Sequence, residues 1–284
     1  MNNQIIVQVN PDVPPTGSDL GIVNAARKSF GRRSEWEPAG AVDDPYSSVK
    51  LKESDKRLLE FLARGMTAND FQELLSEVGR FGYNSYQGSD MDDSLLTELL
   101  WKFRNTPTHD TPFNHGFFSF EVKAPIFVAR QLVKHEYLIM SEYSRRYITD
   151  DIEFYEPDVW RKKAEDIKQG SSSECVDLGS VSASLGDATD TLDTILEWHK
   201  EDCLSLYNNL IDANVAPEQA RMVLPSSLMT SWTWSGTFGA FASMCKLRLA
   251  SDSQYETRLV AQEIYKALEQ QFPVSAPLIV KGVL

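Results

Sequence analysis

The segment at residues 116–149 constrains the fold most, because it predicts a strand that leads directly into a helix. From Phe118 to Lys123, apolar and polar residues alternate, which is the period-two pattern of a half-buried strand. Pro125 suits a first helical turn, where its missing N–H would be unpaired in any case. Apolar residues then recur at helical spacing, so the sequence predicts a helix that runs from 125 to about 135.

The polar side chains of this segment indicate an anion-binding site. Lys134 and His135 follow Gln131 by three and four residues, so all three should project from one face of the predicted helix. Beyond it, the Ser-Arg-Arg sequence at 144–146 places two guanidinium groups next to a hydroxyl, an arrangement that binds phosphate through charge-assisted hydrogen bonds. The alternative interpretation is a solvated basic turn. Residue patterns alone do not decide between the two.

Composition and charge narrow the class of protein. Hydrophobic residues make up 42% and charged residues 24% of the 284 residues, which is typical of a globular protein. No apolar run is long enough to span a bilayer and the N-terminus lacks a signal-peptide pattern, so we expect a cytoplasmic protein without a membrane partner. A net charge of −13 argues against nucleic acid as a partner. Cys175, Cys203 and Cys245 are far apart and outside any C-x-x-C motif, so neither disulfides nor a metal site is predicted.

The rest of the chain predicts mainly helices. An apolar run within residues 1–20 predicts an edge strand, and a helix follows at about 22–30. Apolar residues at three- and four-residue spacing predict further helices at 58–62, 71–78, 95–103, 192–210 and 260–268. We expect a turn and a short helix at 150–168. The Ser- and Gly-rich stretch at 169–190 has low hydrophobicity and is expected to be a flexible loop.

Five stretches resemble the motifs of one enzyme family. The sequence FEVKAPIFVARQ, followed by Lys134-His135-Glu136 and, after seven residues, by Ser144, resembles the signature region of the flavin-dependent thymidylate synthases, in which the triplet is Arg-His-Arg. The other four stretches are AARKSF at 25–30, HDTPFNH at 109–115, PEQARMVLP at 217–225 and LRLASDSQYETRLVAQEI at 247–264.

The resemblance implies a fold and an assembly. It predicts a single α/β (α+β) domain over residues 1–284, in which an antiparallel or mixed sheet is flanked by long helices. Relative to the family, the chain has insertions near 66–95 and 169–190. The resemblance also implies a homotetramer whose active sites are built between subunits.

The resemblance implies a reaction as well. The family methylates dUMP to dTMP with methylenetetrahydrofolate as carbon donor, while NADPH reduces a bound FAD. The residues that match dUMP-binding positions are Gln131, Glu142, Ser144, Arg145, Arg146, Arg221 and Arg258. Those that match FAD-binding positions are Ser29, His109, Thr111, Lys134, His135, Glu136 and Arg248. Arg258 and His109 are the expected catalytic residues, and Arg258 would polarise the uracil ring.

The spacing of two of these arginines bears on where they lie. On one ideal helix, Arg248 and Arg258 would stand about 80° apart around the axis, so we expect them to share a site. No serine or cysteine nucleophile system is evident, which is consistent with a flavin that carries out the redox chemistry.

Some positions differ from the family's usual residues. Lys134 and Glu136 stand in place of two arginines, Asn114 in place of a glutamate, and Thr237 and Gly239 in place of an asparagine and an arginine. A glutamate in the triplet reverses a charge close to an anionic ligand. Two alternatives therefore stay open: a folate-dependent hydroxymethylase that acts on dUMP or dCMP without net reduction by NADPH, and a non-catalytic nucleotide-binding protein.

Overall fold

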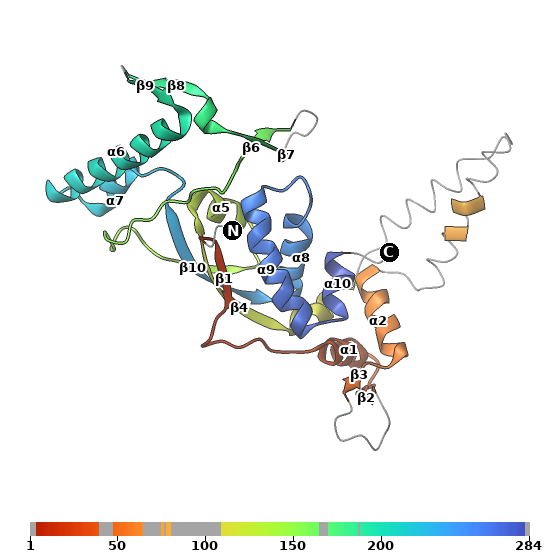
Figure 1. The fold of residues 1–284 in the computed structure, drawn as a ribbon. Helices are drawn as coiled ribbons and strands as arrows, with labels where there is room; N and C mark the ends of the chain where they lie inside the picture. The colour runs from red at the N-terminus through yellow and green to blue at the C-terminus, as the bar shows by residue number, and fades with distance from the viewer. Residues whose placement is uncertain are drawn as a thin grey trace. The chain divides into compact units, whose positions relative to one another are not determined.

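A four-stranded sheet forms from strands that are distant in the sequence (Figure 1). Its order is β1 (Ile6–Val9), β4 (Phe117–Pro125), β10 (Met229–Thr237) and β5 (Ile139–Glu142). β1 pairs antiparallel with β4, and β5 pairs antiparallel with β10. The predicted edge strand near the N-terminus and the predicted strand at 118–123 are both confirmed, as is the mixed α/β class.

The structure is a computed structural model. It describes residues 4–39, 48–64, 75–76, 78–80, 109–164, 170–186 and 188–281. The predicted helices at 71–78 and 95–103, and the insertion near 66–95, lie outside the described residues apart from 75–76 and 78–80.

The chain divides into two units, each assembled from separate stretches of sequence. The first unit comprises residues 1–14, 118–236 and 244–264, and the second comprises residues 15–117, 237–243 and 265–284. The expectation of a single domain remains a prediction.

The two faces of the sheet differ in character within the first unit. On one face, large apolar side chains from β4 and β10 are fully buried, and they include Phe118, Phe120, Trp232 and Trp234. The other face carries short polar side chains joined by hydrogen bonds. The members of this polar ladder are Asn10, Ser119, Glu121, Thr233 and Ser235. Ser119, which the alternation predicted to be half-exposed, is completely buried because this ladder covers it.

The helix after β4 is shorter than the sequence predicted. α5 spans Ile126–Leu132, so Lys134 and His135 lie in the turn beyond it and the predicted shared helical face is wrong. The backbone turns here because Leu138 packs against β10. A Cβ atom at Gly236 would lie 2.4 Å from the Leu138 Cδ2 atom, so the glycine provides the space that Leu138 fills.

Two hairpins replace the structures predicted for residues 150–190. β6 (Trp160–Lys163) pairs antiparallel with β7 (Ser171–Val176), so the short helix predicted within 150–168 does not occur at residues 150–164, and residues 165–168 lie outside the described part. After the 3₁₀ turn η2 (Leu178–Ser180), β8 (Ser182–Leu185) pairs with β9 (Ala188–Thr191), so the loop predicted at 169–190 is largely paired strand.

Helices account for the remainder of the first unit. α6 (Leu192–Asp212) confirms the helix predicted at 192–210, and α7 (Pro217–Ala220) and η3 (Arg221–Val223) follow it. α8 (Phe238–Arg248) and α9 (Tyr255–Gln271) lie side by side, and the buried Cys245 thiol donates to the Ala261 carbonyl. Arg248 ends α8 and Arg258 lies in α9, so the expectation that one helix carries both arginines is wrong.

The second unit packs helices from both ends of the described chain. Its elements are α1 (Asp19–Lys28), β2 (Glu37–Pro38), β3 (Val49–Lys50), α2 (Glu53–Arg64), η1 (Thr111–His115), the start of α8, the end of α9, and α10 (Ser275–Val280). The buried Asp19 carboxylate accepts hydrogen bonds from the Val274 and Ser275 backbone N–H groups and from the Ser275 hydroxyl. One carboxylate thus caps the start of α10.

Candidate functional site

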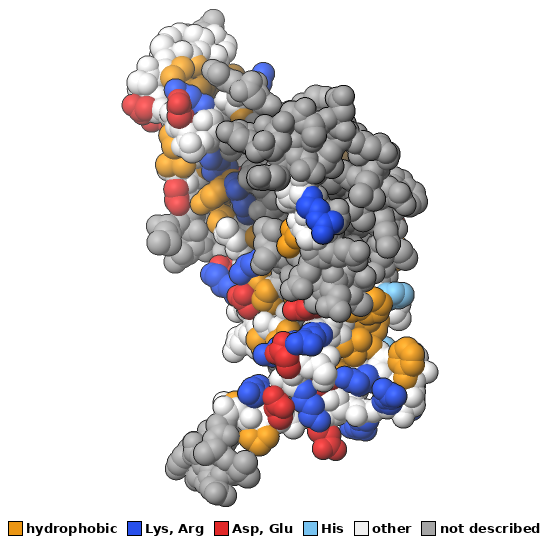
Figure 2. Space-filling view, turned by 90° about the vertical axis from the view of Figure 1, so that its right-hand side faces the viewer, with side chains coloured by type: hydrophobic (Ala, Val, Ile, Leu, Met, Phe, Trp, Pro, Cys, Tyr) orange, Lys and Arg blue, Asp and Glu red, His pale blue; other side chains and the backbone are white. Residues whose placement is uncertain are grey.

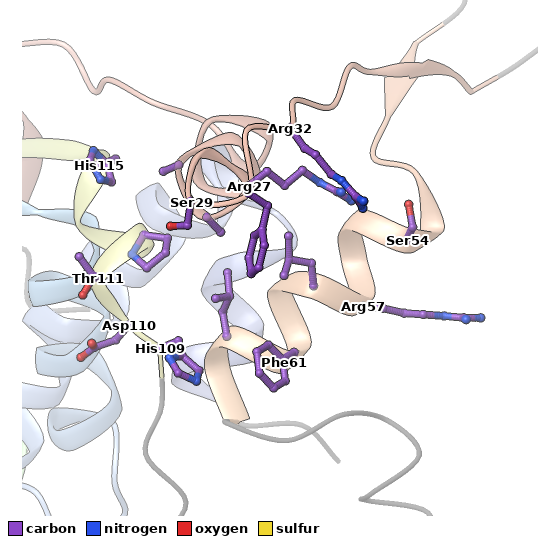
Figure 3. Close-up of a pocket in the computed structure, with 16 residues that line it drawn as sticks. Arg27, Ser29, Arg32, Ser54, Arg57, Phe61, His109, Asp110, Thr111 and His115 are labelled. Atoms are coloured by element: carbon purple, nitrogen blue, oxygen red, sulfur yellow. The ribbon is translucent and has the colours of Figure 1, made fainter.

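A cavity of about 1190 Å³ lies in the second unit and is lined by residues of α1, α2 and η1 (Figure 3). Three of the residues expected to contact the flavin line it: Ser29, His109 and Thr111. They come from separate stretches, since Ser29 caps the end of α1, Thr111 begins η1, and His109 stands two residues before it. The volume exceeds the roughly 300–1,000 Å³ of pockets for drug-sized ligands, so it has room for a dinucleotide cofactor.

Contacts with α2 hold His109 in place at the cavity. The imidazole ring stacks on the Phe61 ring, with ring centroids 5.3 Å apart and an angle of 27° between the ring planes. The His109 backbone N–H donates to the Leu62 carbonyl at 3.0 Å. Figure 3 shows the two rings side by side at the edge of the cavity. His109 is therefore fixed both through its ring and through its backbone.

Basic residues gather at this part of the second unit. Residues 27–39 and 48–64 contain nine Lys and Arg against five Asp and Glu, in a chain whose net charge is −13. Figure 2 shows Lys and Arg side chains around β2, β3 and α2. Arg27 pairs with the fully buried Asp55, whereas within the described residues no ion pair occupies the Arg32 guanidinium, which lines the cavity.

The cavity fits the flavin implied by the motifs. Hydroxyl groups of Ser29 and Thr111 supply hydrogen bonds, the Phe30 and Phe61 rings supply flat apolar surface, and Arg32 supplies a charge for the pyrophosphate. Sequence reasoning missed Arg32 and Phe61. Arg32 follows the AARKSF motif by only two residues, but nothing in its local pattern distinguishes it from other surface arginines.

A second cluster, in the first unit, joins residues from two of the motifs. The Arg248 Nε–H donates to His135 Nε2 at 3.0 Å, and an Arg248 terminal nitrogen donates to the Gln131 carbonyl at 3.1 Å. Burial and then the positive charge of Arg248 lower the pKa of His135 to about 4. Burial also lowers the pKa of Arg248. The imidazole is therefore a neutral acceptor near pH 7.

The same cluster extends to the start of α9. The Gln131 side-chain oxygen accepts from the Thr257 hydroxyl at 3.1 Å, and its nitrogen donates to Gln254. The next residue along α9 is Arg258, whose guanidinium carbon lies 5.7 Å from the centre of the Tyr255 ring. Gln131, His135 and Arg248 are thus linked through one network, although the geometry differs from the single helical faces that the sequence predicted. Arg258 directly follows Thr257, which is a member of this network.

The polar segment after β5 contains arginines in very different environments. Arg145 is 8% exposed, and its terminal nitrogens donate to the Asp150 and Asp151 carbonyls, the second at 2.7 Å. Arg146 is exposed and donates to the Tyr147 hydroxyl at 3.0 Å, so its remaining nitrogens face solvent. Arg145 therefore holds its own loop together, whereas Arg146 is available to a ligand.

The other expected site residues lie on the surface of the first unit. The Glu142 carboxylate accepts from the Thr230 hydroxyl at 2.9 Å, and the Ser144 hydroxyl accepts weakly from the Arg146 backbone N–H at 3.4 Å. Lys134 and Glu136 are exposed. The Arg221 Nε–H donates to the Glu218 carbonyl at 3.4 Å, which leaves most of its guanidinium exposed.

Comparison with known proteins identifies the family. A family model described as thymidylate synthase complementing protein matches residues 15–274, which is most of the chain. The flavin-dependent thymidylate synthase of Thermus thermophilus is 32% identical over 199 residues, or 70% of this chain and 68% of that protein. The chain belongs to the flavin-dependent thymidylate synthase family.

Further flavin-dependent thymidylate synthases support the same assignment. The one from Treponema denticola is 31% identical over 202 residues, which cover 70% of this chain and 71% of that protein. Among solved structures, a UMP/dUMP methylase, PolB from Streptomyces cacaoi bound with 5-Br dUMP, aligns with a TM-score of 0.61 and 23% identity, and covers 96% of this chain and 93% of that one. This likeness shows a shared fold. The resemblance drawn from the five motifs is confirmed, and the chain belongs to a family of enzymes.

Three residues that the sequence analysis singled out as differing from the motifs of the family, Asn114, Thr237 and Gly239, lie close together in the second unit. The Thr237 hydroxyl donates to Asn114 Oδ1 at 2.7 Å, and a Cβ atom at Gly239 would lie 2.6 Å from the same oxygen. Residues that are far apart in the sequence therefore meet in one contact.

Two further observations concern the described part of the chain. No helix there is long and apolar enough to cross a bilayer. No group of three or more His, Cys, Asp and Glu residues in the same stretches is arranged to hold a metal ion.

Proposed function

We propose that this chain is a thymidylate synthase that converts dUMP, methylenetetrahydrofolate and NADPH into dTMP, tetrahydrofolate and NADP⁺ with the aid of FAD. Membership of the family supports the reaction class. The observation that carries the proposal is that Ser29, His109 and Thr111, from two stretches that are far apart in the sequence, line one cavity large enough for the cofactor.

In this proposal, the second unit holds the flavin. When bound there, FAD would supply the hydride-transfer chemistry that connects NADPH to the nucleotide. The Ser29 and Thr111 hydroxyls orient it by hydrogen bonds, and Arg32 neutralises a phosphate charge. His109 is held rigidly by Phe61 and so fixes one wall of the site. Lys134, His135, Glu136 and Arg248, which belong to the first unit, are also proposed as cofactor-binding residues because they match flavin-binding positions of the family.

The nucleotide would be bound by residues of the first unit. Ser144, Arg146 and Arg221 bind the phosphate of dUMP, because each has donors that are not used within the described structure. Gln131 and Glu142 orient the pyrimidine and the sugar. Arg258 polarises the uracil by charge. The buried Arg145 supports this site by fixing the loop rather than by direct contact.

The oligomeric state and the subcellular location of the enzyme are also proposed on the basis of the family. A homotetramer would supply Arg221 from a neighbouring subunit, and the protein would work in the cytoplasm. Analytical ultracentrifugation of the purified protein tests the tetramer directly.

The decisive experiment is an anaerobic incubation with methylenetetrahydrofolate, FAD and NADPH, followed by mass analysis of the nucleotide. Parallel reactions contain dUMP, dCMP or UMP, and one reaction omits NADPH. A methylated uracil deoxynucleotide that requires NADPH is the expected result. A hydroxymethylated product without NADPH would favour the hydroxymethylase, for which the charge reversal at Glu136 is the motivating feature. Unchanged nucleotide in every reaction would support the non-catalytic alternative.

A further inference from the structure

Thr237 joins α8 to η1 through a short chain of hydrogen bonds. The Ala240 backbone N–H donates to Thr237 Oγ1 at 3.2 Å, so the threonine caps the start of α8. The Thr237 hydroxyl in turn donates to Asn114 Oδ1 at 2.7 Å. Because the hydroxyl accepts one hydrogen bond while donating the other, each bond polarises and strengthens its neighbour.

Gly239 keeps the space that this contact needs. A Cβ atom built at Gly239 would lie 2.6 Å from Asn114 Oδ1 and 3.3 Å from Asn114 Cγ. The Asn114 amide is the end of a short side chain and would rotate away, but it would then lose its hydrogen bond to Thr237. A side chain at position 239 is therefore incompatible with the observed Asn114–Thr237 bond.

The contact bears on the cavity because Asn114 belongs to η1. The same short helix carries Thr111 and His115, which line the cavity. Asn114, Thr237 and Gly239 do not line it. Two further contacts hold η1 beside α8: the Phe238 N–H donates to the Gly116 carbonyl at 2.9 Å, and the Phe113 and Phe238 rings lie 6.3 Å apart. The Asn114–Thr237 bond is the side-chain hydrogen bond among the contacts that hold η1 beside α8.

We propose that Asn114, Thr237 and Gly239 act together as a positioning group that fixes η1 and thereby sets the affinity of the cavity for flavin. The proposal rests on the proposed function, because it takes FAD as the ligand. It assigns these residues an indirect role: they place Thr111 and His115, and Gly239 is needed only because Asn114 occupies the space beside it.

FAD titration of the purified protein, followed by flavin fluorescence, tests the positioning role. Thr237→Val and Asn114→Ala each remove one partner, so each should weaken FAD binding by about two- to ten-fold. The double variant should bind no more weakly than the worse single variant, because both changes break the same bond. Thr237→Ser keeps the hydroxyl and should retain the wild-type affinity. Additive losses, or unchanged affinity in both single variants, would overturn the proposal.

Thermal unfolding of the flavin-free protein tests the coupling without the ligand. Gly239→Ala improves helix propensity in α8 but breaks the Asn114 contact, whereas in the Asn114→Ala background only the improvement remains. Gly239→Ala should therefore raise the melting temperature more, or lower it less, in the Asn114→Ala protein than in the wild-type protein. Gly21→Ala in α1 is the matched control, because a Cβ atom there would lie 3.6 Å from its nearest neighbour, the Ser18 Oγ atom. It should change the melting temperature equally in the wild-type and Asn114→Ala proteins.

The two readouts separate the failure of this proposal from failure of the proposed function. If Gly239→Ala has the same effect with and without Asn114, the three residues are not coupled and the positioning group is wrong. If the wild-type protein binds no FAD, the proposed function fails, while the melting comparison still decides whether the residues act together.

Discussion

The burial of His135, together with the positive charge of Arg248 beside it, makes protein stability depend on pH. The pKa of His135 is about 4 in the folded protein, against an ordinary value of 6.5. Between these values the unfolded chain binds more protons than the folded one, so stability falls as the pH is lowered from about 6.5 towards 4. Protonation would also remove the nitrogen lone pair that accepts from Arg248.

Urea unfolding at several pH values between 7 and 4.5 measures this effect. We expect His135→Gln to flatten the dependence in the window from pH 6.5 to 4. The exposed His199 is the control, and His199→Gln should leave the wild-type dependence in place. A dependence that is equally steep after the His135 substitution would contradict the assignment.

Neighbouring arginines are expected to respond very differently to truncation. Arg145→Ala leaves the Asp150 and Asp151 carbonyls without their charged donor and should lower the unfolding free energy by about 2–4 kcal/mol. Arg146→Ala removes only an exposed contact with Tyr147 and should cost less than about 0.5 kcal/mol. In the proposed function, Arg146→Ala instead weakens nucleotide binding. Urea unfolding and dUMP titration of both variants distinguish the two roles, and equal loss of stability would contradict them.

Individual site residues were predictable where a motif fixed them. Ser29, His109 and Thr111 were expected from two separate motifs, and the structure places them in one cavity. Phe61 could not be assigned in this way, because its helical spacing is that of any core residue and only the folded chain stacks it on His109. Likewise, the burial of Arg145 could not be predicted from the sequence, because it depends on the path of the loop that follows it.

At the scale of elements, the hairpin formed by β6 and β7 is tied to the first turn of α9. Arg161 on β6 pairs with the buried Glu256, and its guanidinium carbon lies 4.3 Å from the centre of the Tyr255 ring. The same ring is contacted by Arg258 at 5.7 Å. The hairpin therefore supports the turn that carries a proposed catalytic residue.

Removing this tie should loosen both elements. We expect Arg161→Ala to increase amide hydrogen exchange in β7 and at the start of α9, because Glu256 would be left buried without its partner. Lys162→Ala, on the same strand, breaks only an exposed pair with Glu174 and serves as the control. Mass spectrometry of exchanged peptides resolves the two regions. Unchanged exchange at the start of α9 in the Arg161 variant would contradict the link.

Elements were predictable where burial leaves a periodic pattern. The strand at β4 and the helix α6 follow from alternating and helical apolar spacing. The strands from β6 to β9 carry mostly exposed side chains and are held by backbone pairing, so they leave no such pattern. The end of α5 was missed for a different reason: it depends on Leu138 packing against Gly236, which lies nearly 100 residues later in the sequence.

For the whole molecule, the proposed flavin site predicts a large effect of FAD on stability. At a concentration of 100 times its dissociation constant, a ligand that binds only the folded state adds about 2.7 kcal/mol. For a chain of this size, that corresponds to a rise of roughly 5–10 °C in melting temperature. Riboflavin, which lacks the phosphates, should give a smaller rise at equal concentration, because it offers nothing to Arg32. Differential scanning fluorimetry compares the two, and equal shifts would contradict a role for that arginine.

The Asp19 carboxylate and the Ser275 residue that it caps are separated by 256 positions. During translation, α1 leaves the ribosome long before its partner is made, so this carboxylate has no donors until residues 274 and 275 have been synthesised. Nascent chains arrested before residue 274 should therefore remain sensitive to protease within α1, and full protection should appear only after α10 has emerged. The second unit is therefore completed after the first, although most of its residues are translated before most of those of the first unit.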